Sequence, residues 1–242
     1  MPIRTILLDI EGTTSPIHYT YDVLFPYARR HLQSFLTRRH TENEVQSAIN
    51  SLFHERQSES VTCCQAWNQE NESSNLQSAI EYCLWLMSVD RKSTALKTIQ
   101  GLIWQEGFRS GELQSEVFAD VPAAFKRWRS QNRTVAIYSS GSVLAQKLFF
   151  RYSEWGDLSG YIQCFFDTGV GPKRVAESYR RIFCDLQCPP QEVIFVSDIV
   201  EELDAANEAG IATALAVRPG AELSIPNPSH RVVTDLNTLI AD

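Results

Sequence analysis

The chain has 242 residues, of which 43% are hydrophobic and 21% charged, and its formal net charge at pH 7 is −7. This composition is typical of a globular protein and argues against a disordered chain. The excess of acidic residues makes duplex nucleic acid and anionic membranes poor partners. No apolar run approaches the roughly 20 residues that span a bilayer, and Asp9 interrupts the apolar N-terminal segment too early for a secretion signal. We therefore expect a cytoplasmic protein with no nucleic-acid or membrane partner.

The first half of the chain is predicted to hold one strand followed by helices. Residues 6–10 are almost wholly apolar and precede a Gly-Thr-Thr turn, a pattern typical of a buried parallel strand. From Ser15 to about Glu116, apolar residues recur instead at helical spacing. A polar stretch at residues 56–75 predicts a loop or a fraying helix end within this helical part. The apolar stripes that predict helices lie at residues 24–36, 45–53, 76–87 and 96–103.

After Glu116, segments with strand and helix patterns alternate, which is typical of βαβ units and a parallel sheet. The first strand has to join the same sheet. We therefore predict an α/β fold, with a Rossmann-like parallel sheet covered by helices on both faces (residues 1–14 and 117–242). An all-helical domain (residues 15–116) is predicted to be inserted after the first strand. The expected strands are 135–138, 164–166, 193–196 and 212–217, and the expected helices are 121–130, 142–152, 175–186 and 201–209.

Acidic residues follow two of the predicted strands, at the edge where open α/β sheets bind ligands. Asp9 and Glu11 come after the first strand, and Asp198 follows the strand at 193–196. Carboxylates this close repel one another unless a cation lies among them, and oxygen ligands suit Mg²⁺, which also binds phosphate. The sequence therefore predicts a magnesium site at Asp9, Glu11 and Asp198. Glu201 and Glu202 are adequately explained by the preference for acidic residues in the first turn of a helix.

Three further residues predict a phosphate site. Ser139 and Ser140 precede an expected helix, and the Ser-Ser-Gly-Ser run has more hydroxyl groups than one N-cap requires. Hydroxyl groups and backbone N–H groups at a helix N-terminus can bind phosphate. Lys173 lies at the start of another expected helix, where a cation opposes the helix dipole, and a bound anion would offset that cost.

Together these residues predict a phosphoryl-transfer enzyme. An aspartate carboxylate attacks phosphorus and gives an aspartyl-phosphate, which water then cleaves. Mg²⁺, a serine hydroxyl and a lysine neutralise charge on the transferred oxygens. A second carboxylic acid protonates the leaving alkoxide and later takes a proton from water. We assign Asp9 as the nucleophile and Glu11 as the acid and base.

The same motifs, in the same order, resemble those of the haloacid dehalogenase-like phosphatase superfamily, and the helical insertion resembles its cap domain. Most members carry Asp two positions after the nucleophile, where this chain has Glu11. The run Asp-Ile-Glu-Gly-Thr-Thr-Ser-Pro-Ile at residues 9–17 is instead similar to the enolase-phosphatases of methionine salvage, also called acireductone synthases. That similarity continues at residues 24–27, 90–97, 99–101, 138–143 and 217–220.

This resemblance implies an enzyme that enolises 2,3-diketo-5-methylthiopentyl-1-phosphate and then hydrolyses its phosphate ester. The product would be the acireductone 1,2-dihydroxy-3-keto-5-methylthiopentene, formed during L-methionine salvage from methylthioadenosine. The resemblance also implies substrate contacts at positions matching Ser139, Ser140 and Lys173. One Mg²⁺ per chain would bind at Asp9, Glu11 and Asp198, and we expect a monomer.

Two points stay open on the residues alone. Glu11 would act as the acid and base, would ligate Mg²⁺, or would do both through a water, and its metal contact would come from its side chain or from its backbone carbonyl. The base that starts enolisation would be Glu11, Lys173 or a residue of the inserted domain such as His18, Arg91 or Lys92. The main alternative function is a magnesium-dependent small-molecule phosphatase of the same superfamily with a different substrate.

Overall fold

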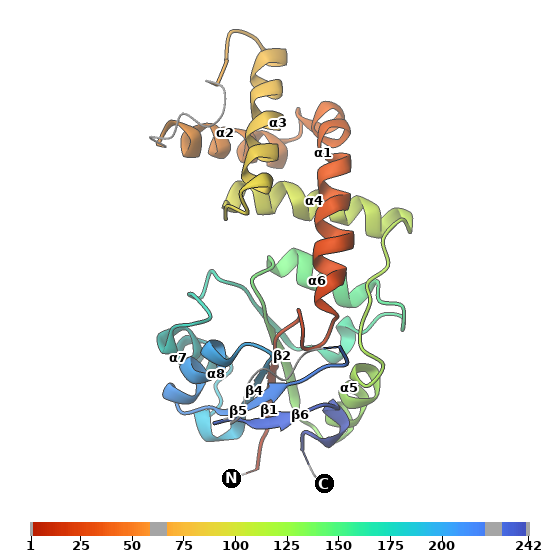
Figure 1. Cartoon of the computed structure of the whole chain (residues 1–242), viewed down its shortest axis with the longest axis vertical. Helices are drawn as coiled ribbons and strands as arrows, with labels where there is room; N and C mark the ends of the chain where they lie inside the picture. The colour runs from red at the N-terminus through yellow and green to blue at the C-terminus, as the bar shows by residue number, and fades with distance from the viewer. Residues whose placement is uncertain (1, 59–66, 221–228, 241–242) are drawn as a thin grey trace. The chain divides into compact units, whose positions relative to one another are not determined.

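The computed structural model describes residues 2–58, 67–220 and 229–240, and the chain forms two compact units (Figure 1). Unit 1 comprises residues 1–20 and 114–242, and unit 2 comprises residues 21–113. These borders differ by a few residues from the expected 14/15 and 116/117. The residues just after the first strand stay with unit 1 because Gly12 N donates to Ser15 O (2.8 Å) and Phe118 N donates to Thr14 O (3.0 Å).

Unit 1 contains a parallel six-stranded sheet with the strand order β3-β2-β1-β4-β5-β6. The central strand β1 pairs with both β2 and β4, so Leu8 lies opposite Ile137 on one side and Val196 on the other. Five strands lie where the sequence predicted them. The sixth, β6, was not predicted; it is an edge strand, and only its last residue, Val233, is buried. The strands are β1 (Thr5–Leu8), β2 (Thr134–Tyr138), β3 (Cys164–Phe166), β4 (Val193–Ser197), β5 (Ala212–Ala216) and β6 (Arg231–Val233).

Helices cover both faces of this sheet, and Figure 1 shows α7 and α8 on one side and α5 on the other. On the side of α7 and α8, Tyr179 and Leu203 pack in one core cluster with Leu7 and Phe195 of the sheet. All four residues of β1 are buried, as expected for a central strand between two helical layers. The predicted Rossmann-like α/β fold is thus confirmed. The helices of unit 1 are α5 (Val121–Ser130), α6 (Val143–Arg151), α7 (Ala176–Asp185) and α8 (Val200–Glu208), with 3₁₀ turns η2 (Ser159–Tyr161), η3 (Pro190–Glu192) and η4 (Leu236–Thr238).

All the regular secondary structure in the described residues of unit 2 is helical. A capping box at Asn71 begins α3, the Ser93 side chain caps α4, and Gly111 ends α4 in the left-handed conformation. In the polar stretch 56–75, α2 continues to Gln57 and α3 begins at Glu72, while residues 59–66 lie outside the described part of the chain. The helices are α1 (Phe25–Arg39), α2 (Asn43–Gln57), α3 (Glu72–Ser88) and α4 (Thr94–Ser110), preceded by a π-helix, η1 (Tyr19–Leu24), that was not predicted. Among the described helices, none has the length and apolarity that a membrane crossing requires.

One buried arginine ties the turn after β1 to distant parts of unit 1. Arg218 Nε donates to Thr13 O (2.7 Å), and its Nη1 donates to Asp120 Oδ2 (2.7 Å). The guanidinium also lies over the ring of Phe118, 4.6 Å from its centroid. Because the fork of an arginine is planar and rigid, these contacts fix the position of the turn that follows Asp9.

Candidate active site

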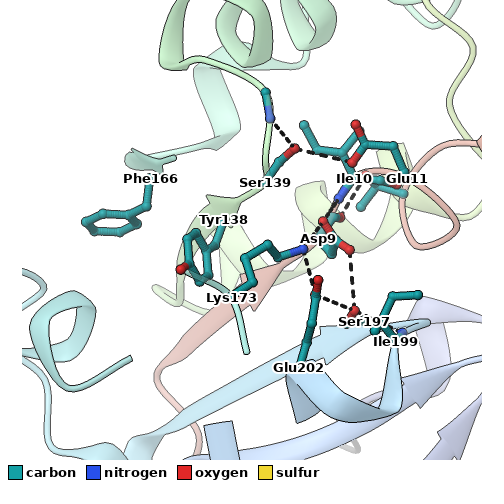
Figure 2. Close-up of polar contacts among 12 residues, drawn as sticks. Asp9, Ile10, Glu11, Tyr138, Ser139, Phe166, Lys173, Ser197, Ile199 and Glu202 are labelled. Atoms are coloured by element: carbon teal, nitrogen blue, oxygen red, sulfur yellow. Dashed lines mark hydrogen bonds and ion pairs between the residues drawn. The ribbon is translucent and has the colours of Figure 1, made fainter. Parts of the chain in front are cut away.

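The site lies at the carboxyl ends of β1, β2 and β4, which are neighbours in the sheet. Asp9 directly follows β1, Ser139 follows β2, and Asp198 follows β4. Lys173 comes from the segment before α7, and Glu202 comes from the first turns of α8. Figure 2 shows Lys173 pointing between the carboxylates of Asp9 and Glu202.

Lys173 is the centre of the charge cluster. Its Nζ lies 2.7 Å from Asp9 Oδ1 and 2.6 Å from Glu202 Oε2, and only 6% of its side chain is exposed. Burial by itself would lower the pKa of Lys173, but the charges of Asp9 and Glu202 and the hydrogen bonds to them raise it above its ordinary value. The site therefore holds a fixed positive charge at neutral pH, which suits an anionic substrate.

Two tyrosines place the backbone and side chain of Lys173. Tyr179, on α7, donates its hydroxyl to Lys173 O (2.7 Å), and Tyr138 donates to Gly171 O (2.9 Å). The ammonium group also lies 5.8 Å from the centroid of the Tyr138 ring. The sequence-based argument from the helix dipole does not apply to Lys173, because α7 begins only at Ala176. Burial between two carboxylates is what distinguishes this lysine.

Both carboxylate oxygens of Asp9 are held. Oδ1 accepts from Ile10 N (2.8 Å) as well as from Lys173, and Oδ2 lies 3.3 Å from the hydroxyl of Ser197. The backbone N–H of Asp9 continues the sheet by donating to Val196 O (3.0 Å). Asp9 is 3% exposed, so its carboxylate is oriented by the protein rather than by bulk water.

Glu202 is a site residue that the sequence reasoning missed. The hydroxyl of Ser197 lies 3.0 Å from Glu202 Oε2 and 3.3 Å from Asp9 Oδ2, and its single proton serves one of the two at a time. Burial, followed by the charge of Asp9, raises the pKa of Glu202. Helix-terminal preference was a sufficient local explanation for this acid. Asp198 lies before α8, which begins at Val200, so helical spacing does not link the two acids, and no local pattern singles out Glu202.

Glu11 and Ser139 lie in contact, across the ends of β1 and β2. Ser139 is fully buried and donates its hydroxyl to Glu11 Oε2 (3.3 Å), while its oxygen accepts from Gly141 N (3.1 Å). Burial, and then the charge of Asp9, raises the pKa of Glu11. Ser140 follows in the same turn and is partly exposed. The structure thus joins the predicted phosphate turn to the predicted acid and base.

Asp198 has an unsatisfied oxygen, which provides the test of whether a metal ion fits. Its Oδ1 is buried without a hydrogen-bond partner. Burial, and then the charge of Asp9, raises its pKa to about 7. Among the described residues, no three His, Cys, Asp or Glu side chains are grouped so that they could hold a metal ion by themselves. Mg²⁺ does not require a complete set of protein ligands, because this ion keeps several waters and uses one or two carboxylates together with substrate phosphate. Asp9 and Asp198 fit that pattern.

Gly12 allows the close approach of Asp198, and we expect Gly12→Ala to impair the site. Its φ is +69°, and a Cβ there would collide with the Asp198 carboxylate, lying 2.5 Å from its Cγ. The variant should lose at least tenfold in phosphatase activity and need more Mg²⁺ for half-maximal rate, while its free energy of unfolding falls by about 1–2 kcal/mol. Activity titrated with Mg²⁺ and thermal unfolding measure both effects.

Gly156→Ala is the matched control for this prediction. Gly156 has a similar φ of +85°, but a Cβ there would have nothing within 4 Å. The Gly156→Ala variant should therefore reproduce the backbone strain of Gly12→Ala without its loss of activity. Equal activity losses in the two variants would show that strain, and not displacement of Asp198, explains the effect.

The remaining candidates for the enolisation base are spread over both units. Glu11 and Lys173 belong to the cluster described above. The ring of His18 is 56% exposed, with Nε2 3.6 Å from Glu116 Oε1. Arg91 and Lys92 belong to unit 2, where the Arg91 guanidinium lies over the ring of Trp85.

Residues 3–210 match the haloacid dehalogenase-like hydrolases. With its parallel sheet and its acidic and lysine residues at the strand ends, the chain belongs to this family of hydrolases. Within the family it falls among the enolase-phosphatases. A Synechococcus elongatus protein named Enolase-phosphatase E1 is 47% identical over 218 residues, which are 90% of this chain and 90% of that protein.

Two further comparisons cover almost the entire chain. An Enolase-phosphatase E1 of Pseudomonas syringae pv. syringae is 42% identical over 238 residues, or 97% of this chain and 96% of that protein. The crystal structure of the UTR4 protein from Saccharomyces cerevisiae superposes with a TM-score of 0.79 at 35% identity, covering 98% of this chain and 100% of that one. The similarity therefore includes both units.

Proposed function

We propose that this chain is a magnesium-dependent enolase-phosphatase that enolises 2,3-diketo-5-methylthiopentyl-1-phosphate and then hydrolyses its phosphate ester to the acireductone. The observation that carries the proposal is the buried Lys173 between the carboxylates of Asp9 and Glu202, at the strand ends where this fold binds ligands. The relatives named Enolase-phosphatase E1 support the choice of substrate.

In this proposal Asp9 is the nucleophile. A carboxylate oxygen of Asp9 donates an electron pair to phosphorus, and the bond between phosphorus and the ester oxygen breaks. Contacts from Lys173, Ile10 N and Ser197 hold the carboxylate in one orientation before the reaction, which lowers the entropic part of the barrier. Water then attacks the aspartyl-phosphate and releases inorganic phosphate.

Glu11 is the proposed acid and base. Its carboxyl group gives a proton to the leaving ester oxygen and later takes one from the attacking water. Its side chain accepts a hydrogen bond from Ser139, a phosphate-turn residue, so it would face a bound phosphate ester rather than the ion. We therefore assign the backbone carbonyl of Glu11, and not its carboxylate, to the metal.

Ser139, Ser140 and Lys173 are the proposed phosphate-binding residues, and Asp9, Asp198 and Glu11 would hold the Mg²⁺. The ion, when bound, neutralises charge on the phosphate oxygens. The unsatisfied Oδ1 of Asp198 supports this assignment, since a buried carboxylate oxygen without a partner is costly unless a cation takes it. We also propose that unit 2 is the cap domain and that the enzyme is a cytoplasmic monomer.

The decisive experiment follows ultraviolet absorbance of a 2,3-diketo-1-phosphate mixed with the protein and Mg²⁺. A conjugated enediol band together with released phosphate, both absent when a chelator is added, is the expected result. Phosphate release from simple esters without action on the diketone would reassign the chain to a phosphatase with another substrate. No phosphate release from either substrate would overturn the proposal.

A further inference from the structure

Gln146, on α6, is buried beneath the phosphate turn and has no part in the function proposed so far. Only 1% of this residue is exposed. Its Nε2 donates to Gly141 O (2.7 Å) and to Phe166 O (2.9 Å), so both amide protons are used on backbone carbonyls. These two carbonyls belong to different segments, the turn after β2 and the end of β3. The side chain therefore joins the turn to the neighbouring strand.

The orientation of this amide is fixed by its surroundings. Both partners are carbonyl oxygens, so only the NH₂ end of the side chain can face them. The opposite atom, Oε1, is buried with no hydrogen-bond partner. An unsatisfied buried acceptor destabilises the fold by about 1–3 kcal/mol. Stability alone is therefore a poor explanation for a glutamine at this position, and an apolar side chain of the same size would avoid the unsatisfied oxygen.

Gln146 determines which way one peptide of the phosphate turn faces. In a trans peptide the carbonyl and the following N–H point in opposite directions. Because Gly141 O is held toward Gln146, the N–H of Ser142 points away from it. On the near side of the same turn, Ser139 Oγ accepts from Gly141 N and donates to Glu11 (Figure 2). Phe166 O, the second partner of Gln146, also accepts from Ser139 N (3.2 Å).

We propose that Gln146 is a positioning residue that holds the Ser139–Ser142 turn in the conformation that binds the phosphate group. This inference rests on the proposed function, because it assigns a role at the same site. Gln146 does not touch the substrate. It acts through Gly141 O in the turn and through Phe166 O, which also accepts from Ser139 N, and neither of these hydrogen bonds involves Asp9 or Asp198. Loss of its two donors should thus weaken phosphate binding and leave magnesium binding intact.

The test measures binding of inorganic phosphate to the full chain, with saturating Mg²⁺, by calorimetry. The Gln146→Met side chain keeps its length but has no hydrogen-bond donor. The Gln146→Glu side chain keeps its shape but has at most one hydrogen-bond donor, the O–H of the protonated acid. Both variants should bind phosphate about tenfold more weakly than the natural chain. The Mg²⁺ concentration for half-maximal activity should stay within twofold. Thermal unfolding, measured in parallel, identifies a variant that does not fold, and two substitutions of different polarity keep the test informative.

Gln163→Met is the matched control. Gln163 accepts from Val135 N (2.6 Å) at the opposite end of β2, so this variant loses a glutamine-to-backbone hydrogen bond far from the turn. It should bind phosphate as the natural chain does. Folded Gln146 variants with unchanged phosphate affinity would overturn the inference, and so would a parallel loss of magnesium affinity. Absence of phosphate binding in the natural chain would instead contradict the proposed function, so the two failures are distinguishable.

Discussion

Asp9→Asn will abolish phosphate release while the chain remains folded. An amide nitrogen or oxygen does not attack phosphorus as a carboxylate does, and loss of a nucleophile typically lowers turnover by 10⁴-fold or more. The fold should tolerate the change because Lys173 keeps a second carboxylate partner in Glu202, 2.6 Å away. The variant also removes the negative charge of Asp9, which together with burial raises the pKa of Asp198 to about 7, so the pKa of Asp198 should fall. Phosphate release under saturating Mg²⁺ measures the loss of turnover, and thermal unfolding shows whether the chain remains folded.

Asp157→Asn is the control for this prediction. Asp157 is exposed and accepts from Ser159 N (2.9 Å) in a loop of unit 1, so the same chemical change there should leave turnover unaltered. Phosphate turnover by Asp9→Asn at the natural rate would remove Asp9 from the role of nucleophile. Loss of activity together with unfolding would show that the ion pair with Lys173 is needed for stability, and the variant would then be compared with Lys173→Met.

Lys173→Met will reduce both stability and activity. The substitution leaves the carboxylates of Asp9 and Glu202 buried without their cation, and breaking a buried ion pair on one side costs about 3–5 kcal/mol. Phosphatase activity should fall on the order of 10³-fold, because a fixed positive charge facing the transferred oxygens is lost. Chemical denaturation and steady-state kinetics on a phosphate ester measure the two losses.

The double variant Lys173→Met with Glu202→Gln separates the two roles of the lysine. Neutralising Glu202 removes one of the two uncompensated charges, so most of the lost stability should return. Activity should not return, because the ammonium group proposed to bind the phosphate is still missing. If the double variant released phosphate at the natural rate, Lys173 would serve only to neutralise Glu202, and its proposed role in substrate binding would be wrong.

The sequence predicted the fold well because the patterns behind it are local. The apolar run of β1 and the amphipathic stripes of α1 and α4 each indicate the type of secondary structure from the hydrophobic pattern of a single segment. By contrast, β6 is an edge strand in which Arg231 and Val232 are exposed, so no buried apolar run marks it in the sequence. The π-helix η1 lies where the chain passes from unit 1 to unit 2, and hydrophobic periodicity does not distinguish it from an α-helix.

The site was predictable in part for a topological reason. Parallel strands all end at the same edge, so Asp9, Ser139 and Asp198 could be brought together without coordinates. Side-chain pairing across that edge depends on distances that no local pattern contains. Glu202 was explained by its place in a helix, and only its 2.6 Å contact with Lys173 identifies it as part of the cluster. Gln146 carries no charge, and its burial on α6 depends on tertiary packing, so no signal in the sequence drew attention to it.

The central place of β1 in the sheet has a consequence for synthesis on the ribosome. β1 emerges first, yet its partners begin only at Thr134 and Val193, beyond the whole of unit 2. At about 5–20 residues per second, the strand waits roughly 6 to 25 seconds for its first neighbour. Unit 2 is continuous in sequence and rich in local contacts, so it can fold during that interval. The nascent chain therefore exposes an apolar segment that cannot yet be buried in its sheet, and this segment is the natural target for a holding chaperone.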